Sequence, residues 1–158
     1  MNALQFFLSS LIAYSGIIVG ILLIRLAKEE QKPLQNYFET AQKIILILIS
    51  SFLLFFLYFF SKILFLISLF LGLLSFLKNK KNKILHYSIL HYAILGTFFY
   101  LSSRNQNLFA INSSFLFIYG VIYSGLHYRV KGKNAVKLLL GSIVFLILSN
   151  LLFTIFHF

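Results

Sequence analysis

Six long apolar segments separated by polar connectors constrain this chain more than any other feature of its sequence. A helix needs about 20 apolar residues to cross the hydrocarbon core of a bilayer, and most of the segments reach or approach that length. The sequence therefore predicts an all-α integral membrane protein with six transmembrane helices in a single polytopic domain. The predicted spans are residues 3–24, 41–60, 63–77, 84–101, 108–126 and 138–157.

The overall composition points to lipid as the solvent for most of the chain. Hydrophobic residues make up 60% of the 158 residues and charged residues 11%, whereas soluble domains average about 45–50% and 25%. The chain therefore has too few polar side chains to cover a water-soluble core. It also has no cysteine, which excludes disulfides, thiolate nucleophiles and cysteine metal sites.

The apolar stretch from residue 44 to 77 decides the number of helices. A single helix of that length would measure about 51 Å at about 1.5 Å per residue, and it would hold Lys62 near the centre of a core about 30 Å thick. Two helices joined by a tight turn at residues 61–62 avoid both problems. The short third helix can span if Lys62 and Lys78 extend their amines to opposite headgroup layers.

The distribution of lysine and arginine predicts the topology. The five connectors carry four, one, four, one and four of these residues, and neither terminus carries any. Strongly basic connectors stay in the cytoplasm. We therefore expect three hairpins, each turning over a basic cytoplasmic loop, with the N-terminus and the C-terminus both outside. The expected location is the plasma membrane, with an organellar inner membrane as the alternative.

The net charge of +11 is spread over these connectors, so it indicates contact with anionic lipid headgroups and not with nucleic acid. The first connector is the longest and the only one with both signs of charge. Within it, residues 34–43 carry apolar side chains at helical spacing, which predicts an amphipathic segment at the interface that leads into the second helix. The residues expected to contact lipid or a partner at the cytoplasmic face are Glu29, Glu30, Glu39, Lys78, Lys80, Lys81, Lys83, Arg129, Lys131 and Lys133.

Histidines mark the cytoplasmic end of the fourth and fifth helices. The stretch "HYSILHYAIL" at residues 86–95 contains His86 at headgroup level and His91 about 7.5 Å deeper. Because residues five apart differ by about 140° around a helix, this pair cannot bind one metal ion from a regular helix. We expect His86 and His127 to be interfacial residues. A metal or acid–base site that joins them to a glutamate of the first connector is the alternative.

A few polar side chains fall inside the apolar segments. A neutral imidazole at His91 needs a hydrogen-bond partner there, and ionisable residues within membranes are candidates for function. Two interpretations stay open: hydrogen bonds between helices, or a polar pathway for a small solute. The candidate residues are His91, Asn150, Ser50, Ser51 and Thr97.

Pairs of small residues four positions apart predict close helix packing, because they let two backbones approach each other. The pairs are Gly16 with Gly20, Ser68 with Gly72, and Gly120 with Ser124.

The sequence favours a protein without catalytic activity or cofactor. The predicted spans contain no aspartate or glutamate, which counts against carboxylate-based coupling to protons or sodium. Nucleotide-binding and zinc-protease motifs are absent as well. We therefore expect an accessory or packing subunit of a membrane assembly, associated with other membrane subunits or with copies of itself. The alternatives are a small-solute transporter or channel passing His91 and Asn150, and a lipid-active enzyme using His86, His127 and a glutamate of the first connector.

Overall fold

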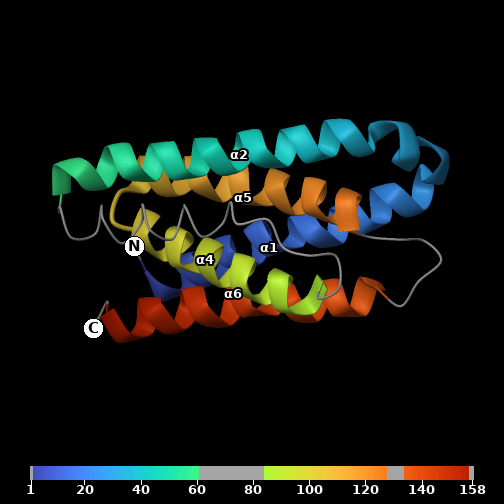
Figure 1. Cartoon of the computed structure of the whole chain (residues 1–158). Coiled ribbons are helices and arrows are strands. Elements are labelled where there is room, and N and C mark those ends of the chain that lie inside the picture. Colours follow the sequence, from blue (N-terminus) through green and yellow to red (C-terminus); the bar gives the residue numbers. More distant parts are fainter. Residues whose placement is uncertain (1, 61–83, 128–133, 157–158) are drawn as a thin grey trace.

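A computed structural model describes residues 2–60, 84–127 and 134–156 of the chain. These residues form five α-helices and one short 3-10 helix, without any strand among them (Figure 1). The prediction of an all-α protein is confirmed for this part of the chain. The elements are α1 (Ala3–Leu26), η1 (Lys28–Glu30), α2 (Gln31–Phe60), α4 (Ile84–Ser102), α5 (Gln106–His127) and α6 (Asn134–Phe156).

Four of the helices are long and apolar enough to cross a membrane. These are Ala3–Leu26, Pro33–Phe55, Gln106–His127 and Ala135–Phe156, and α4 adds the shorter apolar segment Ile89–Ser102. The outer faces of the helices expose large apolar side chains, such as Leu22 at 51% and Ile147 at 60%. Contact with water over such a surface would be unfavourable. The chain is therefore a membrane protein.

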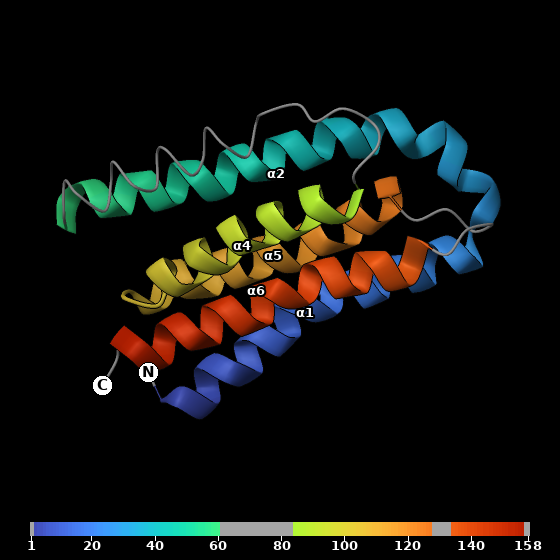
Figure 2. The same ribbon diagram turned by 60° about the horizontal axis from the view of Figure 1, so that its bottom comes forward.

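The helices pack side by side as a bundle (Figures 1 and 2). Helix α1 packs mainly on α5, α4 on α6, and α2 on α5. Helix α2 ends, and α4 begins, at opposite ends of the bundle (Figure 1). The predicted third span at 63–77 and the turn at 61–62 lie outside the described residues.

The second helix includes the predicted amphipathic segment. We expected the helix to begin near Leu34 and to lead through residues 34–43 into a span at 41–60, and α2 runs from Gln31 to Phe60 as one helix. Pro33 lies in its first turn, where a missing N–H costs nothing because the first four N–H groups have no acceptor within the helix. Near this end, the Gln31 side chain donates a hydrogen bond to the Gly125 carbonyl at 3.3 Å. The start of α2 is therefore held against the end of α5.

Glycines bring α1 and α5 into close contact. A Cβ atom at Gly16 would overlap the carbonyl oxygen of Phe117, and one at Gly120 would lie 2.9 Å from the Ile17 nitrogen. A Cβ at Gly20 would overlap the Ser124 hydroxyl. Four of the six small residues singled out in the sequence thus meet at one interface, and the other two, Ser68 and Gly72, lie outside the described residues.

We predict that Gly16→Ala destabilises the bundle by about 1–3 kcal/mol, as overpacking of a filled core usually does. The obstacle is the backbone of Phe117, so relief requires the whole of α1 to move away from α5. The measurement is unfolding in detergent, followed by circular dichroism.

The matched control is Gly125→Ala, because its new Cβ would meet only the end of the Phe38 ring, at 2.9 Å. That ring can turn aside, so we expect a smaller loss than at Gly16. Equal losses for the two variants would contradict the prediction.

Candidate functional site

A polar network of three residues centres on the buried Tyr119 of α5. Tyr119 and His91 are 0% and 2% exposed, respectively. The Tyr119 hydroxyl forms a short hydrogen bond with Nε2 of His91 in α4. The side-chain amide of Gln42 in α2 donates a second bond to the same hydroxyl at 2.8 Å. One phenol oxygen therefore connects three helices.

The tautomer of His91 decides the direction of its bond to Tyr119. The Gln42 amide nitrogen can only donate, so the Tyr119 oxygen accepts from it. The phenol proton is donated to Nε2 in the neutral tautomer that carries its proton on Nδ1, and in the other tautomer Nε2 donates to the phenol oxygen. An uncharged imidazole is the form that an apolar interior favours.

The His91 and Tyr119 rings belong to a larger group of packed rings. We call this group the aromatic cluster, and its members are His91, Tyr92, Tyr119, Tyr123 and His127. The His91 ring lies 5.5 Å from that of Tyr119 and 6.2 Å from that of Tyr123, nearly parallel to both. Tyr119, Tyr123 and His127 follow one another at intervals of four on α5, which places them on one face. Their neighbouring ring centroids are 5.8 and 4.2 Å apart. The cluster thus extends from the interior to the end of α5.

His127 closes this cluster at the end of α5. It is half-buried, and its Nδ1 lies 3.1 Å from the Tyr123 carbonyl oxygen. The structure does not describe the His86 side chain, so its expected interfacial position and the alternative site that joins it to His127 both stay predictions. Glu29, Glu30 and Glu39 are all exposed. Within the described ranges, no three histidine, aspartate or glutamate side chains gather closely enough to hold a metal ion.

Asn150 belongs to a different junction from His91. Its side-chain nitrogen donates to Ser10 Oγ in α1 at 3.0 Å and to the Leu146 carbonyl of its own helix at 2.8 Å. His91 joins α4 to α5 through Tyr119, which Gln42 of α2 also binds, whereas Asn150 joins α6 to α1. The two residues that we had grouped as one pathway therefore satisfy their hydrogen bonds at separate places.

The remaining pathway candidates make local contacts or face outward. Thr97 donates to the Ala93 carbonyl one turn earlier, at 3.0 Å. Ser50 is half-buried and Ser51 is exposed. None of these contacts extends the network around Tyr119. The basic residues Lys78–Lys83 and Arg129–Lys133 that we assigned to the cytoplasmic face lie outside the described residues.

The sequence analysis missed the residue at the centre of the site. Tyr119 was not among the polar residues that we singled out within the apolar segments. The spacing of Tyr119, Tyr123 and His127 on one helical face was a usable signal. Gln42 was also missed, because it stands in the amphipathic segment before the second apolar run.

Comparison with known protein families, curated proteins and solved structures gave no match to this chain. Its function is therefore argued from its own chemistry.

We predict that Tyr119→Phe destabilises the bundle by about 1–3 kcal/mol, the cost of leaving a buried polar group without its partner. The variant keeps the ring and its packing but removes the oxygen that binds His91 and Gln42. Equilibrium unfolding in detergent measures the change. The control is Tyr37→Phe on the exposed face of α2, where the side chain is 71% exposed and the change stays within about 0.5 kcal/mol. A neutral result at Tyr119 would show that its hydroxyl contributes nothing to stability.

Proposed function

We propose that this chain is a six-span protein of the plasma membrane, with both termini outside, that acts as an accessory or packing subunit of a membrane assembly. It has no catalytic role in this proposal. The basic connectors lie at the cytoplasmic face, where they contact anionic lipid headgroups and the neighbouring subunits. The spans are those predicted above, including residues 63–77.

The observation that carries this proposal is the enclosure of His91. A transport pathway needs polar groups that water or a solute can reach, whereas His91 is 2% exposed and lies against the Tyr119 and Tyr123 rings. An interior cavity of about 10 Å³ lies nearby, and His91 is not among its lining residues. A volume of this size accommodates at most one water. The close packing of His91 against these rings supports a structural role over transport.

The directions of the described helices support the proposed topology. The α1–α2 connector, the start of α4, the end of α5 and the start of α6 share one end of the bundle (Figures 1 and 2). The α4–α5 connector, the end of α2 and the two chain ends share the other (Figures 1 and 2). The first group flanks the three strongly basic connectors, and the second group flanks the weakly basic ones. This is the separation that cytoplasmic retention of basic loops requires.

We predict which side of the membrane each connector faces, and labelling of single-cysteine variants measures it. Each introduced cysteine is then the only thiol in the protein, because the native chain has no cysteine. Arg104→Cys, on the exposed turn between α4 and α5, should react with a membrane-impermeant maleimide added to intact cells. Lys28→Cys, in η1, should react only after permeabilisation and serves as the matched control. The reverse pattern would overturn the proposed orientation.

The subunit role predicts a stoichiometric neighbour. The tagged chain, purified from its native membrane in mild detergent and analysed by mass spectrometry, should bring a second membrane protein at a constant ratio. Moving the tag from one terminus to the other is the control, because the partner should persist. Recovery of the chain alone, or only as copies of itself, would contradict the subunit role.

Two alternatives receive less support. Small-solute transport is favoured only by the presence of polar groups in the bundle, and its two main candidates, His91 and Asn150, are hydrogen-bonded to other residues of the protein. The lipid-active enzyme depends on His86, His127 and a glutamate acting together. In the described part of the chain Glu29, Glu30 and Glu39 are exposed, and Glu39 acts on the His127 imidazole through its charge without a hydrogen bond to it.

A further inference from the structure

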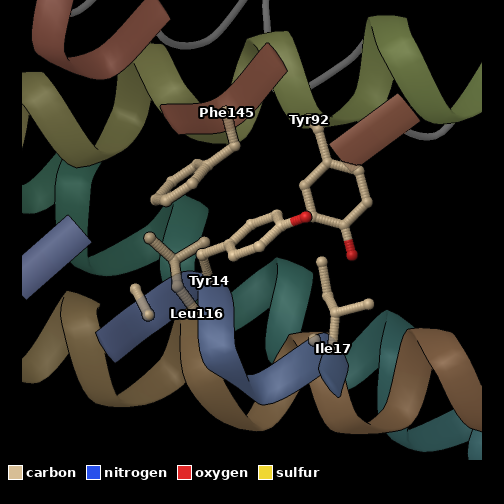
Figure 3. A pocket seen from close by; sticks show the side chains of 7 residues that line it. Tyr14, Ile17, Tyr92, Leu116 and Phe145 are labelled. Atoms are coloured by element: carbon tan, nitrogen blue, oxygen red, sulfur yellow. The ribbon is translucent and has the colours of Figure 1, made fainter. Parts of the chain in front are cut away.

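A small cavity lies where four helices meet in the interior of the bundle (Figure 3). Helix α1 contributes Ala13, Tyr14 and Ile17 to its wall, and α4, α5 and α6 contribute the others, among them Tyr92 and Gly120. Its volume is about 10 Å³. A cavity needs about 10–15 Å³ to hold one water molecule. The space therefore suits a single water and no larger ligand.

The wall of this cavity holds a buried hydroxyl that lacks a partner in the described structure. Tyr92 is 4% exposed, and its oxygen makes no hydrogen bond with any described residue. Figure 3 shows its ring along one side of the cavity, with the hydroxyl directed toward Ile17. Buried hydroxyl groups in proteins nearly always have a protein or water partner. A ligand that accepts a hydrogen bond from Tyr92 would give this hydroxyl its partner.

Tyr14 supplies the second polar atom of the wall. Its hydroxyl donates to the Leu139 carbonyl at 3.3 Å, which is long beside the usual 2.7–2.8 Å for such a bond. The lone pairs of the Tyr14 oxygen remain available to accept a hydrogen bond. The other lining side chains are apolar, so the two tyrosines are the side chains that can hold a polar ligand here.

We infer that the cavity binds one structural water molecule, which accepts a hydrogen bond from Tyr92 and donates one to Tyr14. The water connects α4 to α1, two helices that also touch through the Phe6 and Phe99 rings, whose centroids are 5.1 Å apart. Two partners meet the lower limit for a buried water, which typically has two to four. This site is independent of the proposed subunit role, because it depends only on the packing within one chain.

The effect of Tyr92→Phe on the melting temperature tests the inference. If the cavity is dry, Tyr92→Phe removes an unsatisfied hydroxyl and leaves the melting temperature unchanged or raised. If the water is bound, the same variant breaks the bridge and lowers the melting temperature by about 2–4 °C. In a Tyr14→Phe background, where the bridge is already lost, Tyr92→Phe should then have almost no effect. An unchanged or raised melting temperature for the single variant overturns the inference, as does an undiminished loss in the double variant.

The control is Tyr37→Phe, an exposed tyrosine that should show no change. Should the cavity variants fail to fold, the wild-type protein decides the question by high-resolution structure determination in lipid. A density peak within hydrogen-bonding distance of both hydroxyl oxygens supports the water. Absence of that peak in a map that resolves other ordered waters refutes it.

Discussion

Hydrogen bonds that a soluble protein would make with water are kept inside the helices of this bundle. Lipid offers neither donors nor acceptors, so each polar group in a span needs a partner from the protein itself. The buried serines meet this requirement locally, since Ser10 donates to the Phe7 carbonyl and Ser102 to the Phe99 carbonyl, each at 2.7 Å. Some of the larger polar side chains also reach a neighbouring helix. Those few groups therefore fix how the helices rotate against each other.

Tyr119 is the clearest case of such a group. Its oxygen receives the Gln42 amide and binds His91, so α2, α4 and α5 share one fixed point. Asn150 does the same for α6 and α1 through Ser10, and Asn112 for α5 and α4 through the Phe98 carbonyl at 3.3 Å. Between these points the contacts are apolar and non-directional. The polar bonds set the register, and the apolar contacts and close backbone approach fill the space between them.

The location of several helices could be predicted from the sequence, but their neighbours could not. Apolar run length placed a span at 3–24, and α1 is Ala3–Leu26; it placed another at 108–126, and α5 is Gln106–His127. The helical spacing of apolar residues after Pro33 placed the start of the second helix near Leu34, and α2 begins at Gln31. The partner of His91, however, was missed. Tyr119 is 28 positions away, and its place depends on how α5 is rotated, which the length of an apolar run does not determine. The glycine pairs were informative because close backbone approach has few other solutions in lipid.

The contact of α1 with α5 has a consequence for biosynthesis. Gly16 and Gly20 face Gly120 and its neighbours, about 100 residues later in the chain, and translation at about 5–20 residues per second takes roughly 5–20 s to cover that distance. During this interval the first helix is already in the bilayer, and the groove formed by its glycines faces lipid or the insertion machinery. The main interface of the protein is therefore completed only after most of the chain has been inserted.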